Sequence, residues 1–342
     1  MIEHTHGNLL DADVEALVNT VNTVGVMGKG IALQFRQAYP ANFTVYHAAC
    51  SRGEVTPGQM LVVPTNQLTN PRYIINFPTK RHWRGNAQME DIDSGLAALR
   101  DAVRAYQIRS LAVPPLGCGN GGLPWDAVRP KIEAAFADLP AVRVLLYAPE
   151  GAPDPATIRV ATTRPSMTLV RAAVLGLIAQ YAPRGYRVTM LEIQKLAYFL
   201  ESAGESLRLD FAKARYGPYS ETLHHVIQRI DGHFVRGYGD RTQEISLHPL
   251  PDAVEAARIV LAAHADTQAR LDRVGALIEG YETPYGVELL ASVHWVAQEN
   301  PAARQDADRA TEAIHAWNER KRQFRADHIT LAWGQLHTHH WI

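Results

Sequence analysis

Two glycine-rich loops, each lying between a strand and a helical stretch, constrain the fold of this chain more than any other feature. The first follows a buried-strand pattern over residues 18–22 and reads Thr23-Val24-Gly25-Val26-Met27-Gly28-Lys29-Gly30. The second follows another apolar strand and reads Gly117-Cys118-Gly119-Asn120-Gly121-Gly122. Such a loop presents backbone N–H groups at a helix N-terminus, where the helix dipole favours anions. Two of these loops facing each other predict a pocket for a diphosphate.

The first 150 residues alternate short apolar strands with helical stretches, which predicts an α/β domain with a central mixed sheet over residues 1–150. The strands are expected at 15–20, 60–63, 73–77, 111–113 and 142–147. Ligands of such sheets bind beyond the carboxyl ends of the strands, which is where both glycine loops fall. The sequence therefore predicts one crevice bordered by both loops.

A second domain is expected from the length of 342 residues and from a change in composition after residue 150. Residues 151–165 lack periodicity and contain three prolines, so we interpret them as a linker. Residues 166–342 are expected to form a mostly α-helical domain. Its helices are predicted at 167–181, 189–204, 251–279 and 301–324.

The formal net charge of −1 excludes a broad basic surface, so any contact with DNA must be local. No apolar run is long enough to span a membrane, and the polar start lacks the apolar core of a signal peptide, which favours a cytoplasmic protein. His337, His339 and His340 are interpreted as a polar tail, because no cluster of carboxylates or cysteines accompanies them. We expect neither a metal nor a cofactor.

The two loops, the lysine between them and their order resemble the macrodomain family, whose members bind ADP-ribose. The runs Gly28-Lys29-Gly30-Ile31-Ala32-Leu33 and Phe77-Pro78-Thr79-Lys80 narrow this resemblance to one branch. That branch contains the terminal ADP-ribose protein glycohydrolases and the DarG-type DNA ADP-ribosylglycohydrolase antitoxins. The resemblance covers the N-terminal half and implies a three-layer macrodomain around the mixed sheet.

The resemblance also implies which residues contact ADP-ribose. Asn22 matches the asparagine near the distal ribose, whereas Asn19 is expected to lock the strand end to a neighbouring loop. Gly7-Asn8 stands where many macrodomains have a Gly-Asp pair for the adenine amino group, and an Asn carbonyl can still accept that hydrogen bond without charge assistance. The expected substrate-binding residues are Asn8, Leu9, Thr20, Asn22, Gly25, Met27, Gly28, Lys29, Gly30, Ile31, Thr79, Trp83, Gly117, Cys118, Gly119, Asn120, Gly121 and Gly122.

Lys80 is the candidate catalytic residue, because it ends an apolar strand at the ligand-facing edge. In the terminal ADP-ribose glycohydrolases, the lysine of a matching Thr-Lys motif acts at the anomeric carbon of the distal ribose. Cleaving a glycosidic bond there builds oxocarbenium character, and the leaving group must be protonated or otherwise stabilised. A lysine serves as a nucleophile if its pKa is lowered, or as an acid if it stays charged, and the sequence leaves both roles open.

One departure separates this chain from the protein-directed enzymes of the branch. Those enzymes have an acidic residue shortly after Gly-Cys-Gly, whereas this chain has Asn120-Gly121-Gly122. A route through an ester-linked intermediate that needs this acid is therefore disfavoured, and the pattern fits the DarG-type antitoxins better. Lys80, a bound water and the substrate's own phosphates remain for a reaction based on positioning and electrostatics.

The loop after Lys80 carries residues suited to a nucleobase. Two roles stay open for Trp83: with His82 it stacks on a flipped or single-stranded base beside the scissile bond, or it caps the edge of the sheet. Arg81 and Arg84 would then supply the local phosphate contacts that a near-neutral protein needs for DNA.

Two short signatures in the C-terminal half resemble the SocA-like (Panacea) antitoxin domain. They are Lys195-Leu196-Ala197-Tyr198 on an expected helix and Tyr216-Gly217-Pro218, which is expected to be a turn with core packing. The resemblance implies that residues 166–342 bind a cognate DNA ADP-ribosyltransferase toxin of the DarT type. We assign these residues no catalytic role.

These expectations combine into a two-domain antitoxin. Its macrodomain would hydrolyse the bond between ADP-ribose and a thymine base in DNA, single-stranded or flipped out, and would release ADP-ribose. The alternatives are hydrolysis of ester-linked ADP-ribose on proteins, hydrolysis of ADP-ribose 1''-phosphate, and a module that only reads ADP-ribose. Lys80 argues against a pure reader. No membrane partner is expected.

Overall fold

The computed structural model of the protein describes residues 1–149, 157–181, 188–238 and 246–342. These residues form two compact units, of which the first comprises Met1–Thr163 and the second comprises the described residues from Arg164 to Ile342. The expected linker over 151–165 lies partly outside the described residues. Its described part contacts the first unit, where the Ala161 N–H donates to the Gln37 carbonyl over 2.8 Å.

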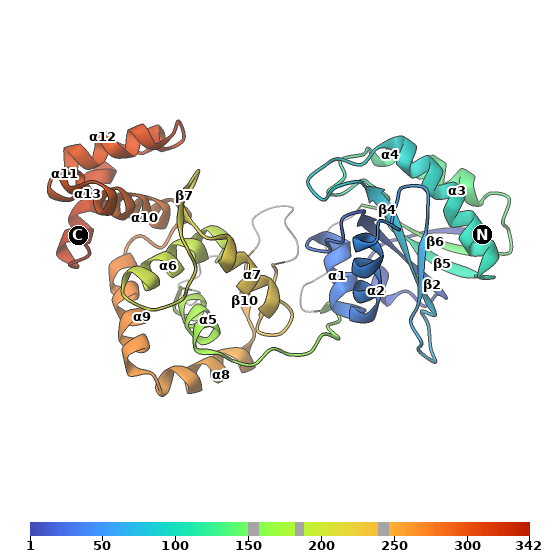
Figure 1. The fold of residues 1–342 in the computed structure, drawn as a ribbon, viewed down its shortest axis with the longest axis horizontal. Helices are drawn as coiled ribbons and strands as arrows, with labels where there is room; N and C mark the ends of the chain where they lie inside the picture. The colour runs from blue at the N-terminus through green and yellow to red at the C-terminus, as the bar shows by residue number, and fades with distance from the viewer. Residues whose placement is uncertain (150–156, 182–187, 239–245) are drawn as a thin grey trace. The chain divides into compact units, whose positions relative to one another are not determined.

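The first unit is built on a six-stranded sheet with the strand order β1-β6-β5-β2-β4-β3 (Figure 1). The strands are β1 (Ile2–Thr5), β2 (Ala16–Asn22), β3 (Leu61–Pro64), β4 (Tyr73–Lys80), β5 (Ser110–Val113) and β6 (Arg143–Tyr147). β3 pairs antiparallel with β4, and the other neighbours pair parallel. The predicted mixed sheet is therefore confirmed.

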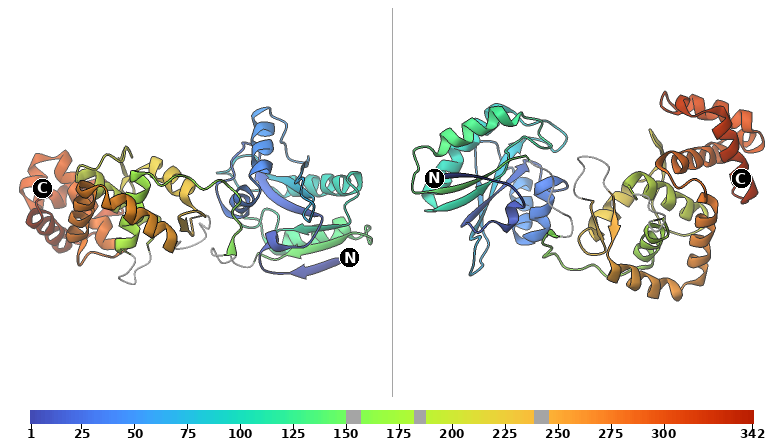
Figure 2. Two further views of the ribbon diagram at one scale, coloured as in Figure 1. Left: turned by 90° about the horizontal axis from the view of Figure 1, so that it is seen from below. Right: turned by 180° about the vertical axis from the view of Figure 1, so that it is seen from behind.

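The sequence analysis missed β1, which lies at the edge of the sheet beside β6 (Figure 2). An edge strand pairs on one side only and therefore tolerates charged side chains. Glu3 of β1 forms an ion pair with Arg143 of β6, with 2.9 Å between Oε1 and Nε. The polar start of the chain thus belongs to a strand.

Helices cover both faces of the sheet, which confirms the expected three layers (Figure 1). On one face lie α1 (Gly30–Ala38) and α2 (Pro40–Ser51), and on the other lie α3 (Met89–Ala105) and α4 (Trp125–Phe136). The alternation along β2 explains this arrangement, because successive side chains point to opposite faces. Leu17 packs in a hydrophobic cluster with Phe35 of α1, whereas Val18 packs in another with Leu96 of α3.

The second unit is mostly helical, as expected (Figure 1). Its helices are α5 (Leu169–Tyr181), α6 (Met190–Ser202), α7 (Glu221–Ile230), α8 (Pro251–Ala262), α9 (Ala265–Ile278), α10 (Pro284–Glu299), α11 (Pro301–Gln305), α12 (Ala307–Trp317) and α13 (Ala326–Thr338). Two antiparallel strand pairs accompany them, β7 (Ala212–Ala214) with β8 (Gly217–Tyr219) and β9 (Val235–Arg236) with β10 (His248–Pro249). Within the described ranges, no helix is both long and apolar enough to cross a membrane.

Helix boundaries in the second unit differ from expectation where single residues interrupt the apolar pattern. The helix expected over 251–279 divides at His264, whose backbone leaves the helical region with φ −132° and ψ 70°. The stretch 301–324 divides at Asp306. The Asp306 side chain accepts hydrogen bonds from the N–H groups of Asp308 and Arg309, so it caps the N-terminus of α12.

The sequence analysis also missed α10 and α13. α10 is buried almost all round, so it lacks the polar face that marks an amphipathic helix. The C-terminal histidines, interpreted as a polar tail, are accessible as expected, but one of them lies in a helix. His337 belongs to α13, where its Nε2 lies 3.2 Å from the Arg304 carbonyl and its ring centroid lies 4.0 Å from that of Trp333.

The two signatures of the expected antitoxin domain meet in the second unit. Lys195 on α6 donates from Nζ to the Pro218 carbonyl on β8 over 2.5 Å. Gly217 and Pro218 are buried, as expected for a turn packed against the core. Tyr216 is 42% exposed, so the core packing expected for this residue is wrong.

Candidate active site

The carboxyl ends of β2, β4 and β5 meet at one edge of the sheet, because β2 pairs parallel with both neighbours. The first glycine loop follows β2, residues 81–88 follow β4, and the second glycine loop lies between β5 and α4. A shift in the pairing at Thr79 places Asn22 opposite Lys80. The sheet thus brings all three segments to the edge where the crevice was expected.

Asn22 shapes the first glycine loop. Its Oδ1 accepts hydrogen bonds from the N–H groups of Val24, at 3.0 Å, and Val26, at 3.3 Å, and its Nδ2 donates to the Val26 carbonyl at 2.5 Å. The Tyr46 hydroxyl on α2 donates to the Asn22 carbonyl at 2.7 Å. The side chain that was expected to meet the ribose therefore organises the loop, and its contact with ADP-ribose stays a prediction. Tyr46, which was not expected from the sequence, holds Asn22 through this hydrogen bond from α2.

Asn19 has the structural role that the sequence analysis expected. It is fully buried, and its Nδ2 donates to Oδ1 of Asn76 on β4 over 3.0 Å. Asn76 in turn donates to Oδ1 of Asn42 on α2 over 2.7 Å. These bonds pair the Asn19 and Asn76 amides with their neighbours, whereas Oδ1 of Asn19 accepts no hydrogen bond within the described residues. This chain of amides fixes the neighbouring strands against α2, directly behind the first glycine loop.

The second glycine loop is tightly packed at some positions and open at others. A Cβ added at Gly121 would lie 2.3 Å from the Gly117 carbonyl oxygen, so only glycine fits there. A Cβ added at Gly119 would meet nothing within 4 Å. At Gly30, the first residue of α1, an added Cβ would lie 3.1 Å from Nδ2 of Asn120. The two glycine loops therefore lie against each other at Gly30 and Asn120.

Lys80 lies at the junction of these segments. Its ammonium group donates a hydrogen bond to the Asn120 carbonyl of the second glycine loop. Partial burial lowers the pKa of Lys80 below its ordinary value, because desolvation disfavours the charged form. The sequence left the nucleophile and acid roles open, and a lowered pKa favours the nucleophile, since it enlarges the fraction of neutral amine.

Residues 81–88 are tied to both glycine loops. Thr23 of the first loop donates from Oγ1 to the Arg81 carbonyl over 2.6 Å. The Ala87 N–H donates to the Gly121 carbonyl of the second loop over 3.0 Å. The Arg81 guanidinium forms two hydrogen bonds, of 3.1 and 3.3 Å, to the buried carboxylate of Asp91. The Arg81 side chain remains 73% exposed beside this carboxylate, so its contact with a phosphate of DNA stays a prediction.

Trp83 projects from this tied segment. It is 40% exposed, and its ring stacks on His82 with a centroid distance of 5.6 Å and an interplanar angle of 29°. The Arg84 guanidinium lies 4.5 Å from the centre of the Trp83 ring. Trp83 is therefore partly accessible beside Lys80, and the stacking of a base on its ring stays a prediction.

Asn8 and Leu9, which were expected at the adenine end, both have partners in the protein. Oδ1 of Asn8 accepts a hydrogen bond from the Leu10 N–H over 3.1 Å and caps a 3-10 turn over Leu9–Asp11. Leu9 is buried in the hydrophobic cluster that also contains Phe35. Hydrogen bonding of adenine by Asn8 stays a prediction that requires its oxygen to accept a second donor.

Other predicted contact residues support the loops from inside. Met27 is buried in a cluster with Tyr46, and Thr79 is buried beneath the strand end. Burial raises the pKa of the Cys118 thiol to about 11, so this group stays neutral and serves as a small filler of its loop. The remaining predicted contacts are partly or fully accessible or belong to loop backbone, and their binding of ADP-ribose stays a prediction. They are Thr20, Gly25, Gly28, Lys29, Ile31 and Gly122.

A three-layer unit with two glycine loops at the carboxyl edge of its sheet is a macrodomain, and the Macro domain family model matches residues 18–132. The similarity to one relative extends over nearly the whole chain. The DNA ADP-ribosyl glycohydrolase of Thermus aquaticus is 45% identical over 336 residues, which cover 98% of this chain and 93% of that protein. The chain therefore belongs to the family of DNA ADP-ribosyl glycohydrolases.

Two further similarities cover part of the chain. The DNA ADP-ribosyl transferase-DNA ADP-ribosyl glycohydrolase fusion protein of Thermosipho africanus is 34% identical over 139 residues, which cover 36% of each chain. The solved structure of the macrodomain of Mycobacterium tuberculosis DarG is 57% identical and covers 44% of this chain and 99% of that one, with a TM-score of 0.44.

Proposed function

We propose that the first unit hydrolyses the N-glycosidic bond between ADP-ribose and a thymine base of DNA, and that it does so in the cytoplasm. The observation that carries the proposal is the position of Lys80, whose ammonium group contacts the second glycine loop and which lies opposite Asn22 at the root of the first. A diphosphate held by the loops would bring the distal ribose to the end of β4. The name of the Thermus aquaticus relative supports DNA as the substrate.

The reaction adds water across the glycosidic bond: the anomeric carbon gains a hydroxyl group, and the base nitrogen gains a proton. In the route that we favour, the neutral Lys80 amine attacks the anomeric carbon as the bond to the base breaks, and the proton that the amine loses goes to the base nitrogen. The ribose ring then opens to an imine with Lys80, and water hydrolyses this imine to release the lysine. In the alternative route, the Lys80 ammonium protonates the leaving base while water attacks directly. Borohydride would trap the lysine–sugar adduct only in the first route.

The proposed activity is tested with a short oligonucleotide that carries ADP-ribose on one thymine. We expect the full chain to release free ADP-ribose and to restore the unmodified oligonucleotide. Parallel assays with an ADP-ribosylated glutamate peptide and with ADP-ribose 1''-phosphate address the alternative substrates. Faster turnover of either one would overturn the DNA assignment, and binding of all three without turnover would leave only a reader of ADP-ribose.

Trp83 is proposed as the contact for a nucleobase beside the scissile bond. Its exposed ring, stacked on His82 and bordered by Arg84, supports this role, because stacking tolerates any base and an adjacent arginine can meet a phosphate. Replacing Trp83 with alanine should weaken binding of the oligonucleotide substrate more than binding of free ADP-ribose.

The second unit is proposed to bind and inhibit a DNA ADP-ribosyltransferase toxin, so that the chain acts as an antitoxin in two ways. Its two antitoxin signatures contact each other through Lys195 and Pro218, as expected if both belong to one antitoxin domain. The fusion protein of Thermosipho africanus joins a transferase and a glycohydrolase in one name, which supports a functional link between the two activities. Co-purification of this chain with the transferase encoded beside its gene tests the proposal.

A further inference from the structure

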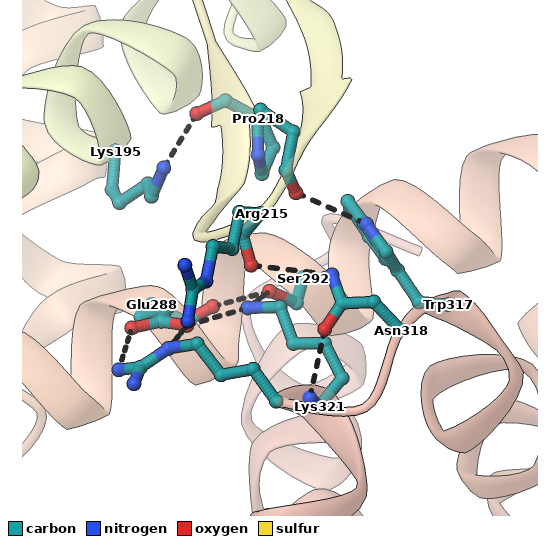
Figure 3. A network of polar contacts seen from close by, with 10 residues as sticks. Lys195, Arg215, Pro218, Glu288, Ser292, Trp317, Asn318 and Lys321 are labelled. Atoms are coloured by element: carbon teal, nitrogen blue, oxygen red, sulfur yellow. Dashed lines mark hydrogen bonds and ion pairs between the residues drawn. The ribbon is translucent and has the colours of Figure 1, made fainter.

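A buried polar network lies beneath the turn between β7 and β8 (Figure 3). Lys321 donates from Nζ to Oε1 of Glu288 and to Oγ of Ser292, each over 2.7 Å. Arg320 contacts the other oxygen of Glu288 over 3.2 Å. Lys195 donates to the Pro218 carbonyl nearby. Glu288, Lys321 and Lys195 are each no more than 2% exposed. Burying charges in this way is expensive, and such networks are retained in some proteins because they fix one conformation.

The network holds one element, the Arg215-Tyr216 turn, from several sides. The indole Nε1 of Trp317 donates to the Ala214 carbonyl over 3.1 Å, and Nδ2 of Asn318 donates to the Arg215 carbonyl over 3.3 Å (Figure 3). Gly217 follows the turn with a φ of +95°, and an added Cβ there would lie 3.0 Å from Ser292 Oγ. The turn therefore rests on α10 and on the segment after α12 in one fixed conformation.

The fixed turn presents an aromatic ring that has two guanidinium groups close to it. Tyr216 is 42% exposed, and the Arg320 guanidinium lies 4.5 Å from its ring centre. The Arg215 guanidinium lies 5.6 Å from the same centre. We call Arg215, Tyr216 and Arg320 the Tyr216 patch. The carboxylate of Glu288 balances only one of the basic groups around it, so the patch and the network beneath it carry a net positive charge.

We propose that the Tyr216 patch is the anchor point at which the second unit binds an acidic segment of its DNA ADP-ribosyltransferase partner. The inference rests on the proposed toxin binding and adds the surface and the chemistry of the contact. Tyrosine and arginine are the residues that most often carry the binding energy of protein interfaces, and a turn held in advance loses little entropy when it binds. An arginine stacked on a ring still offers its N–H edges to a carboxylate.

A protein segment suits the patch better than a nucleic acid. Base stacking requires an accessible ring face, and two guanidinium groups compete with a base for the Tyr216 ring, as His82 and Arg84 do at Trp83. The neighbouring Trp317 ring carries Lys213, with Nζ 4.5 Å from the ring centre, and Lys213 is already paired with Glu299 over 3.4 Å. Carboxylates need no free ring face and can pair with Arg215 and Arg320 from outside.

The test uses the full chain in a Lys80→Ala background, in which inhibition of the transferase can come only from binding. The probe is the transferase encoded beside the gene of this chain, assayed by the modification of a thymine oligonucleotide. Tyr216→Ala and Arg215→Glu should each weaken binding at least about tenfold, whereas Tyr216→Phe should stay within about threefold of the parent. Ile259→Ala, which removes another exposed apolar side chain of the same unit, should change nothing.

The outcomes separate this inference from the proposed function. If the Lys80→Ala chain inhibits the transferase and the Tyr216→Ala variant inhibits it equally well, the Tyr216 patch is not the anchor although toxin binding stands. If the Lys80→Ala chain itself does not inhibit, toxin binding and the patch both fail. If Tyr216→Ala instead weakens binding of an unmodified single-stranded oligonucleotide and spares the transferase, the patch is a nucleic-acid site. Unchanged thermal unfolding of each variant is required for these comparisons.

Discussion

Lys80 donates a hydrogen bond to the backbone carbonyl of Asn120, so the candidate catalytic amine contacts the loop that is proposed to hold the diphosphate. The side chain of the same Asn120 borders the start of α1, where a Cβ added at Gly30 would lie 3.1 Å from its Nδ2. One residue therefore touches both the reacting group and the other glycine loop.

Lys80→Ala should slow the release of ADP-ribose from a thymine-modified oligonucleotide by about 10²-fold or more, the scale of a single acid, base or nucleophile. Binding of free ADP-ribose should change little, because the glycine loops keep their backbone contacts. Single-turnover kinetics and calorimetry measure the two effects. Lys131→Ala, which removes an exposed lysine paired with Asp93 on the outer helices, is the matched control. Equal turnover in the Lys80 variant and the parent would remove Lys80 from the mechanism.

Gly119→Glu should abolish binding of ADP-ribose while the protein stays folded. An added Cβ at Gly119 meets no atom within 4 Å and the fold therefore accepts a side chain there, but a carboxylate would repel the diphosphate. Gly119→Ala adds a methyl group without charge and should retain most of the affinity. Calorimetry with ADP-ribose compares the two variants. Tight binding by Gly119→Glu would mean that the second loop has only a structural role.

The sequence was sufficient to predict the features that depend on local rules. The glycine loops, the strand ends and the position of Lys80 follow from periodicity and from the conformations that glycine permits. The partners of polar side chains were not predictable, because they come from distant parts of the chain. Asn22 bonds within its own loop, and Arg81 pairs with Asp91 on α3. α10 was missed because a helix buried on all sides has no polar face to reveal its period.

The exposure of the Tyr216 side chain was also not predictable from the sequence. An aromatic residue beside a Gly-Pro pair is typical of a packed turn, and Gly217 and Pro218 are indeed buried. The network of Lys195, Glu288 and Lys321 fills the space beneath the turn and leaves Tyr216 outside. These three residues lie far apart in the chain, so no local pattern connects them.

The stability of the second unit should fall as the pH drops below 6.5, partly because of His294. Burial lowers the pKa of His294 to about 4, and its Nδ1 lies 2.8 Å from the Tyr198 hydroxyl. Between the two pKa values, the unfolded chain binds a proton that the folded chain excludes, so the free energy of unfolding decreases toward acid and levels off below about pH 4. The effect amounts to roughly 2 kcal/mol by pH 5.

His294→Asn should flatten this pH dependence, because the variant has no group that titrates at this position. Urea unfolding at pH 7 and pH 5 measures the free energy of unfolding of parent and variant. The other histidines and the carboxylates are the same in both proteins, so the difference between their changes with pH is due to His294. The variant is expected to be less stable than the parent at pH 7, since Asn fills less of the buried space. Parallel pH profiles for the two proteins would contradict the assigned burial effect.

A chain that ends at Thr163 should hydrolyse the DNA substrate with the same kcat/KM as the full chain and should not inhibit the transferase. The first unit contains Lys80 and both glycine loops. It extends past the last strand, because Ala161 bonds to Gln37 and the Arg159 guanidinium lies 5.8 Å from the ring centre of Tyr39.

A chain that ends at residue 149 lacks these contacts. It should keep the activity but unfold at a lower temperature, by the equivalent of about 1 kcal/mol for the lost hydrogen bond. Thermal unfolding and the oligonucleotide assay compare the three lengths. Loss of hydrolysis in the folded Thr163 chain would show that the second unit contributes to catalysis, and the proposed division of labour would fail.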